Sequence, residues 1–217
     1  MPEKVKTVRS YHSPRRAAQA AATRQVILEA AQRLFEQQGY PATTMAAIAD
    51  EAGVALKTVY LAFETKSGVV RALWQVLLGG VADDAPVAQR DWYREVMHEP
   101  DPRRVLLLNA RNARVVKERA GGLMSVVRDA APSDPDLAAL WELIQSDFHA
   151  NQASIVELLH RKKALRPRLS VARATDILWS LNHPDLWHLL VVVRQWTAPQ
   201  YERWVADCAC QQLLRSP

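Results

Sequence analysis

The chain has 217 residues, of which 49% are hydrophobic and 24% charged, and its formal net charge is +5. These values exclude a disordered chain, a collagen-like repeat and a coiled-coil rod, and the length suits one large domain or two small ones. Only 7 residues are glycine, which favours helices over tight-turned sheets. No apolar run approaches the ~20 residues of a membrane span, and the first residues lack the apolar stretch of a signal peptide. We therefore expect a cytoplasmic protein.

An N-terminal arm, residues 1–22, begins the most basic part of the chain. Residues 1–24 contain six basic residues and one acidic residue, whereas residues 25–70 contain three basic and five acidic ones. A basic arm can bind nucleic-acid phosphates or enter a minor groove. We therefore expect Arg15 and Arg16 to contact DNA; the alternative is a tail that only improves solubility.

The first predicted helix begins at Ser13-Pro14, because serine is a good N-cap and proline suits the first helical position. Apolar residues recur at helical spacing along it, and Gly39 supplies a C-terminal stop. Thr44 is the predicted N-cap of a second helix, which Gly53 ends.

Val54 and Ala55 begin a predicted third helix, which carries Leu56 to Phe63. A fourth opens at Thr65 or Lys66 and is ended by the pair Gly79-Gly80 and by Pro86. No segment alternates convincingly at the period of a strand, so we expect an all-α fold with a small N-terminal unit and a larger helical bundle. Proline, glycine and capping residues bound the remaining predicted helices. These cover residues 87–98, 102–119, 122–131, 134–164, 170–182, 184–195 and 199–214.

Residues 44–63 have the pattern of a helix–turn–helix. Two short helices are joined by a tight turn at Gly53, which permits positive φ. Apolar residues lie where the helices must pack, and Lys57, Thr58 and Tyr60 are left facing outward. The second helix is then free to enter a major groove. An ordinary three-helix corner would look similar, so the spacing alone leaves both interpretations open.

At these residues the sequence closely resembles the TetR (tetracycline-repressor-like) family of transcriptional regulators. The resemblance covers residues 26–70, about a fifth of the chain, in family order and spacing. It implies an all-helical homodimer that binds palindromic operator DNA and releases it when a small molecule enters the C-terminal domain. The matching residues are Ile27-Leu28-Glu29-Ala30-Ala31, Leu34-Phe35, Gly39-Tyr40, Thr43-Thr44-Met45-Ala46-Ala47-Ile48-Ala49, Ala52-Gly53-Val54, Thr58-Val59-Tyr60, Phe63 and Lys66.

The resemblance also implies DNA contacts at particular residues. Thr44 matches a helix cap that touches a phosphate, and Tyr60 and Lys66 match phosphate contacts. The alternatives are that Thr44 is only a cap, that Lys57 is a solvated surface lysine and that Tyr60 is a core aromatic. The positions that match contacts to base edges are Leu56, Lys57 and Thr58.

Two positions depart from the family pattern. The family often has serine or threonine where Ala55 stands, so the third helix lacks a good N-cap, which costs ~1 kcal/mol. The family also often has histidine or tyrosine at Ala62, where a phosphate contact is commonly made. Both departures lower the expected affinity for operator DNA, and the basic arm is expected to offset them through phosphate contacts.

We expect a helix–turn–helix domain over residues 23–70, followed by a second domain that contains the rest of the chain. Residues 71–217 contain all seven tryptophans and are expected to bind an apolar or aromatic effector. Polar side chains among apolar neighbours need partners, which either a ligand or the protein itself supplies. Trp179, Asn182 and His183 are the first candidate effector site. The further candidates are Asn109, Asn112, Trp141 and Phe148.

The last helices carry more apolar residues than a terminal helix pair needs in a monomer, which predicts a homodimer through residues 170–214. The sequence has no nucleophile elbow, phosphate loop, His-Glu-x-x-His or Cys-x-x-Cys motif. We therefore expect no catalytic residue, no metal and no cofactor, and we keep an enzyme only as a rival hypothesis. A ligand-independent architectural DNA-binding protein is a second rival hypothesis, and an activator of the same family is a third.

Overall fold

The computed structural model describes residues 14–79 and 91–215. These residues form helices, with one isolated antiparallel bridge between Leu165 and Leu214, which confirms the all-α prediction. Among the described helices, none is long and apolar enough to cross a membrane. The first 13 residues of the predicted arm and residues 87–90 of a predicted helix lie outside the described ranges.

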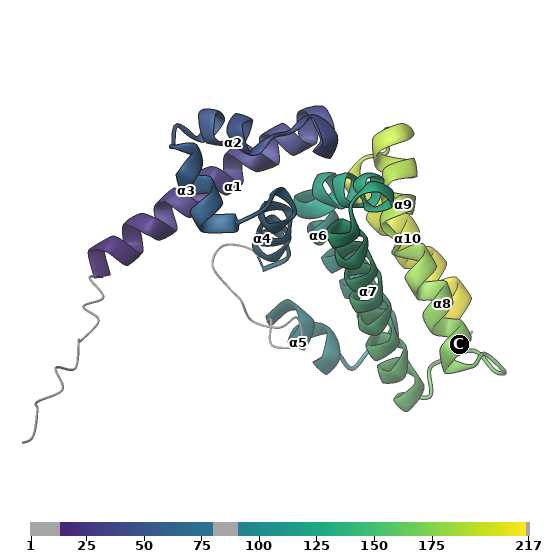
Figure 1. Ribbon diagram of the computed structural model, residues 1–217. Helices are drawn as coiled ribbons and strands as arrows, with labels where there is room; N and C mark the ends of the chain where they lie inside the picture. Colours follow the sequence, from purple (N-terminus) through teal and green to yellow (C-terminus); the bar gives the residue numbers. More distant parts are fainter. Residues whose placement is uncertain (1–13, 80–90, 216–217) are drawn as a thin grey trace, which may run out of the picture.

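Helices α1 (Pro14–Ala42), α2 (Met45–Ala52), α3 (Leu56–Phe63) and α4 (Lys66–Gly79) form the N-terminal part. The first turns of α1 extend beyond α2 and α3 (Figure 1). Gly39 interrupts the helical geometry with a φ of 77°, at the place where the sequence predicts a stop. Buried apolar side chains hold these helices together, among them Ile27, Phe35, Ile48 and Val59.

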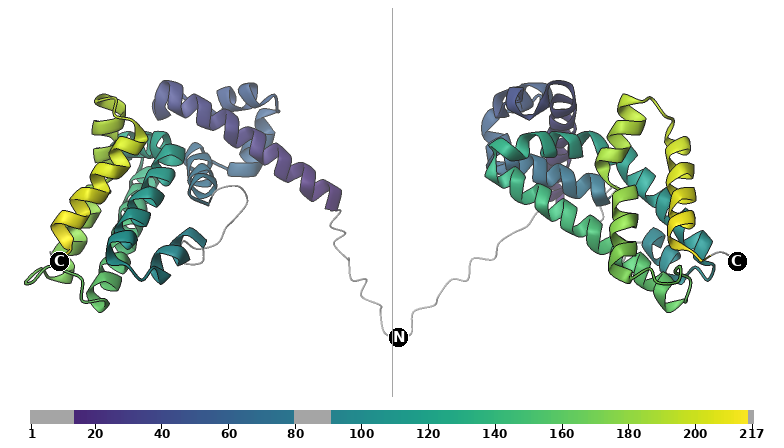
Figure 2. Two further views of the ribbon diagram at one scale, coloured as in Figure 1. Left: turned by 180° about the vertical axis from the view of Figure 1, so that it is seen from behind. Right: turned by 90° about the vertical axis from the view of Figure 1, so that its right-hand side faces the viewer.

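The C-terminal part is a bundle with α6 and α7 at its centre. α10 packs on α6 and α8 packs on α7, so these later helices lie on the side away from α4 and α5 (Figure 2). The elements are α5 (Asp91–His98), α6 (Pro102–Ala130), the 3₁₀ turn η2 (Ala131–Ser133), α7 (Pro135–Arg161), α8 (Val171–Leu181), α9 (Pro184–Trp187), the π-helix η3 (His188–Val193) and α10 (Ala198–Leu213).

The helix break predicted between residues 119 and 122 is wrong, because α6 runs through Gly121 and Gly122 without interruption. A glycine inside a helix costs up to ~1 kcal/mol relative to alanine, but it does not end the helix. A Cβ at position 121 would lie 3.3 Å from the indole nitrogen of Trp187, and one at position 122 would lie 2.9 Å from a carboxylate oxygen of Glu36. The two glycines therefore let α9 and α1 approach α6 closely.

The helical segment predicted over residues 184–195 is present over residues 184–193, but it is not one uniform α-helix. Pro184 opens one α-helical turn, which His183 caps by accepting a hydrogen bond from the backbone N–H of Asp185 at 3.2 Å. The chain then widens into the π-helix η3. The run Val191–Val193 at the end of this segment is β-branched, and such side chains slightly lower α-helix propensity.

One apolar core joins the two parts of the protein. Trp74 of α4 lies in the same cluster of buried side chains as Leu123 of α6 and Leu137 of α7. The predicted boundary at residue 70 falls inside α4, which contacts both α3 and α6. The helix–turn–helix is therefore positioned on the bundle by apolar packing.

Candidate DNA-binding surface and ligand sites

The helix–turn–helix has the local geometry that its sequence predicts. The hydroxyl of Thr44 accepts a hydrogen bond from the N–H of Ala47 at 3.0 Å, which makes it the N-cap of α2. Gly53 has a φ of 65°, in the left-handed region that favours glycine. Ala55 begins α3 without a side-chain hydrogen bond, so α3 has the weak cap that the sequence predicts.

The outward face of α3 carries the residues that the sequence assigns to DNA contact. Leu56 is 42% exposed and Tyr60 is 48% exposed, so Tyr60 is not a core aromatic. Lys57 is exposed and Thr58 is half-buried, whereas the next residue, Val59, is fully buried in the domain core. The structure thus brings Leu56, Lys57 and Tyr60 onto the accessible side of one short helix.

Arg24 fixes the end of α3 against α1. Its guanidinium donates to the carbonyl oxygen of Ala62 at 2.8 Å and lies 4.2 Å above the ring of Phe63. A cation at the C-terminal end of a helix interacts favourably with its dipole. The sequence showed Arg24 only as one more basic residue, because the two partners are 38 positions apart and no local pattern connects them.

The other predicted DNA contacts lie at the edges of this surface. Arg15 and Arg16 are exposed on the projecting first turns of α1. Lys66 is bound within the domain, because its ammonium donates to the carbonyl oxygens of Tyr40 at 2.8 Å and Thr43 at 2.9 Å. Burial lowers the pKa of Lys66, and nearby Asp134 opposes that shift. Lys66 therefore closes the link between α1 and α2, a role that the sequence did not indicate.

Two hydrogen bonds tie α1 and α4 to the start of α7. The hydroxyl of Tyr40 donates to Asp134 at 2.6 Å, and the hydroxyl of Ser67 donates to Asp136 at 2.8 Å. Burial raises the pKa of Tyr40, and the bond to Asp134 adds to the shift. The same bond lowers the pKa of Asp134. Asp134 also caps α7, so a movement of α7 would act directly on both contacts.

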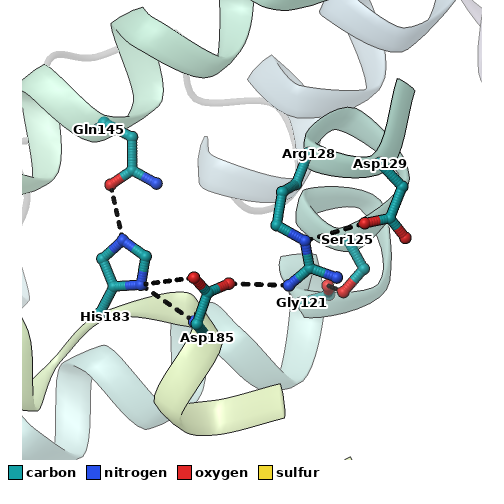
Figure 3. Close-up of polar contacts among 7 residues, drawn as sticks. All are labelled: Gly121, Ser125, Arg128, Asp129, Gln145, His183 and Asp185. Carbon is teal, nitrogen blue, oxygen red and sulfur yellow. Dashed lines mark hydrogen bonds and ion pairs between the residues drawn. The ribbon is translucent and has the colours of Figure 1, made fainter. Parts of the chain in front are cut away.

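His183, a member of the first candidate effector site, lies in a polar network between three helices (Figure 3). Its Nε2 lies 3.1 Å from the side-chain oxygen of Gln145 on α7, and its Nδ1 lies 3.4 Å from Asp185. Arg128 of α6 donates to Asp185 at 2.8 Å and also pairs with Asp129. Burial lowers the pKa of His183, with Asp185 opposing the shift. The network holds α9 against α6 and α7.

The predicted candidates Asn109 and Asn182 meet at Gln152, a residue that no local sequence pattern singles out. Asn109 donates to the side-chain oxygen of Gln152 at 2.9 Å, and Asn182 donates to the same oxygen at 3.3 Å. All three amides are buried. Within the described residues, the side-chain oxygen of Asn182 and the indole nitrogen of Trp179 are buried without a hydrogen-bond partner. The cluster is thus paired internally but not fully satisfied.

A cavity of about 50 Å³ lies beneath α5 and reaches this cluster. Asn109, Asn112 and Phe148 line it together with Trp92, and a second cavity of about 220 Å³ shares Trp92 and Asn112 with it. Trp179, Asn182 and His183 line neither cavity, and Trp141 packs against the core beside α4. The structure therefore separates the predicted effector residues into a group beneath α5 and a group beside α9.

Residues 27–73 match the model of the family described as "Bacterial regulatory proteins, tetR family". This chain carries a TetR-family DNA-binding domain. It is 30% identical over 112 residues to the HTH-type transcriptional regulator AcrR of Shigella flexneri, an alignment that covers 50% of this chain. The chain spans about half of that relative, 49% of its length.

Solved structures of TetR-type regulators share the fold along most of the chain. NalD, the secondary repressor of the MexAB-OprM multidrug efflux pump in Pseudomonas aeruginosa, superposes with a TM-score of 0.68 at 19% identity, covering 92% of this chain and 100% of NalD. SmeT in its complex with triclosan gives a TM-score of 0.67 at 19% identity, covering 90% of this chain and 93% of SmeT. At this identity the likeness concerns the fold.

Lys117 is a buried charged group that the sequence did not lead us to expect. It lies in the middle of α6 with 1% of its surface exposed, and its ammonium donates to the carbonyl oxygen of Ala113 at 3.5 Å, a long hydrogen bond. Burial lowers the pKa of Lys117 to about 7. The sequence carried one sign of this burial, because Lys117 stands beside the apolar residues Val116 and Ala120, which are themselves buried.

Substituting Lys117→Met should remove a pH dependence of stability. An unfolded lysine has a pKa near ~10.4, so between about pH 7 and pH 10 unfolding takes up a proton. Wild-type stability should therefore rise with pH in this window, by up to ~1.4 kcal/mol per pH unit, and the charged group should cost most below pH 7. Urea unfolding at several pH values would measure this. Parallel stability profiles for the wild type and the variant would contradict the shift.

Proposed function

We propose that the chain is a ligand-responsive transcriptional repressor that binds palindromic operator DNA as a homodimer and is released by a small apolar or aromatic effector. One observation carries the proposal: a TetR-family helix–turn–helix whose recognition helix α3 leaves Leu56, Lys57 and Tyr60 accessible. An activator would share this surface. A ligand-independent architectural protein would share it too, but would not respond to an effector.

The DNA contacts proposed for the site divide into two kinds. Leu56, Lys57 and Thr58 face base edges, because they lie on the first turn of α3, the end that enters a major groove. Tyr60 and the hydroxyl of Thr44 bind phosphates on the groove edges. Arg15, Arg16 and the remaining ammonium proton of Lys66 add phosphate contacts around them.

Tyr60→Ala should weaken operator binding by ~1–3 kcal/mol while the fold and the oligomeric state persist, because Tyr60 is half-exposed and supports no core contact. The operator would be selected from random DNA with the wild-type protein, and affinity would be measured by fluorescence anisotropy. Tyr60→Phe is the matched control for the hydroxyl: it should behave like Tyr60→Ala if the hydroxyl binds phosphate. Wild-type affinity in Tyr60→Ala would remove Tyr60 from the contact surface.

The proposed dimer interface is the surface made by α8, η3 and α10, within residues 170–214. On η3, Leu189 is 52% exposed, Val192 is 50% exposed and Val193 is 57% exposed. Neighbouring apolar side chains exposed to this degree on one short segment are typical of a protein–protein interface. A two-fold arrangement would bring the same surface of both chains together and space the two recognition helices about one turn of DNA apart.

Val193→Glu should dissociate the dimer and abolish operator binding together, because it places a charge inside the proposed apolar interface. Sedimentation velocity at micromolar concentration would report the mass, and anisotropy would report DNA binding. Leu107→Glu is the matched control, since Leu107 is 40% exposed on α6, outside the proposed interface. A wild-type protein that sediments as a single chain would overturn the homodimer.

The proposed effector site is the pair of cavities beneath α5, where aromatic rings and amide side chains converge. Trp92, Asn112 and Val116 line both cavities, so the two spaces adjoin one another. α7 lines this site and also holds Tyr40 and Ser67 through its first turn, so a shift of α7 on ligand binding would change the placement of α3. The proposal moves the site away from Trp179 and His183.

Triclosan, the ligand in the SmeT complex, is a suitable first probe for an aromatic effector. It should lower operator affinity by about 5- to 150-fold, the usual range of allosteric coupling. Phe148→Ala should remove this response, and Trp179→Phe, outside the cavities, should retain it. Anisotropy titrations with and without triclosan would measure both. The reverse pattern would return the effector site to Trp179, and an unresponsive wild type would contradict an aromatic effector of this size.

A further inference from the structure

A separate cavity of about 430 Å³ lies where the end of α1 meets α6, α9 and η3. Its volume is within the range of small-molecule sites. Most of its wall is apolar or aromatic, with Phe35 and Tyr40 from the DNA-binding part and Trp187 from α9. Gly121 and Gly122 line it as well, at the positions where α6 lacks side chains.

Lys117 forms part of this wall, and 1% of its surface is exposed. The rings of Phe148 and Tyr201 lie 5.9 Å and 5.6 Å from its ammonium, at the outer limit of cation–π contact. Among the described residues, no carboxylate pairs with Lys117, and the 3.5 Å hydrogen bond to Ala113 satisfies one of three N–H donors. Burying an ammonium in this way is costly unless an anion accompanies it.

A polar network holds in place the part of the wall that α9 contributes through Pro184 and Trp187. The network of Gln145, His183, Asp185 and Arg128 fixes the start of α9 on α6 and α7, beside Ser125 and Gly121 of the cavity wall (Figure 3). The hydroxyl of Ser125 donates to the carbonyl of Gly121 at 3.2 Å. Preorganised walls lower the cost of binding because less order is lost when the ligand enters.

We propose that this junction cavity binds a small amphipathic carboxylate, with its acidic group paired to Lys117 and its apolar body between Tyr40 and Trp187. The other charged groups of the wall, Glu36 and Asp129, are exposed carboxylates, so they favour an orientation with the ligand's acid turned inward. The site is distinct from the effector cavities beneath α5. Its test uses no DNA, so a failure of this proposal can be distinguished from a failure of the proposed repressor function.

The test uses calorimetry on the full-length protein with 2-naphthoate and its neutral analogue 2-naphthamide. The wild type should bind 2-naphthoate at least about tenfold more tightly than 2-naphthamide, because only the carboxylate forms a charge-assisted hydrogen bond. Lys117→Met should reduce this preference to within about twofold. Lys162→Met, which removes a remote lysine at the end of α7, should keep it. Equal affinities of the wild type for the two compounds would overturn the proposal.

Proton uptake gives a second, independent reading of the same contact. Because burial lowers the pKa of Lys117 to about 7, a bound carboxylate should draw a proton onto it at pH 8, and the uptake should be much smaller at pH 6. Titrations in buffers of different ionisation enthalpy measure this number. Proton uptake that persists in Lys117→Met would be due to another group and would overturn the pairing.

The other titratable groups around Lys117 are Glu36 and Tyr40 of α1, Asp129 of α6, His183 and His188 at the two ends of α9, and Tyr201 of α10.

Two further variants test the location. Glu36 is exposed at the cavity wall and lies outside the proposed dimer interface, so Glu36→Trp should partly close the cavity from the α1 side, and Ser125→Leu should fill it from the α6 side. Each should weaken 2-naphthoate binding at least about tenfold in a protein with wild-type helical content. Binding that both variants leave intact would place the carboxylate elsewhere and overturn the site.

Discussion

The first turn of α7 holds the recognition helix in its place relative to the bundle. Asp134 uses one carboxylate oxygen to cap its own helix, accepting from the N–H groups of Asp136 and Leu137, and the other to accept from Tyr40. Asp136, two residues further along, accepts from Ser67 at the start of α4. Helix capping and attachment of the DNA-binding helices thus depend on neighbouring carboxylates, and neither can change without the other.

The apolar core adds stiffness to this polar attachment. Side chains of α1 and α4 share one cluster with those of α6 and α7, so the helix–turn–helix rests on the same packed layer that the bundle uses. Arg24 then fixes the far end of α3 to α1, and Lys66 fixes the link between α1 and α2. A shift of α7 would therefore reach α3 through short contacts, most of which are part-buried.

Local signals in the sequence were enough to predict the helix–turn–helix. Thr44 caps α2, Gly53 turns with positive φ and Ala55 leaves α3 uncapped, because each of these properties depends on a few adjacent residues. Glycine was a misleading signal in α6, where Gly121 and Gly122 serve close packing instead of termination. The sequence alone does not distinguish a glycine that ends a helix from one that permits close packing, because the difference lies in the residues that surround it in the folded structure.

The candidate ligand sites were predicted less well, because their geometry is set by contacts between distant segments. Asn109 and Asn182 were chosen as polar residues among apolar ones, but Gln152, which joins them, carries no comparable local pattern. His183 was expected beside a ligand and lies in a network that fastens α9. Lys117 escaped notice because a single lysine in an amphipathic helix is usually on the solvent side, and here the helix is covered on that side as well.

The shared core has a consequence for the use of this domain as a separable module. A fragment that ended at Gly79 would expose the faces of Phe35, Leu73 and Trp74 that now pack against α6 and α7. It would also leave the hydroxyls of Tyr40 and Ser67 without the carboxylates that accept from them. A chimera that grafts these DNA-binding helices onto another bundle would therefore have to carry the matching surface of residues 116–144 with them, or rebuild it in the host.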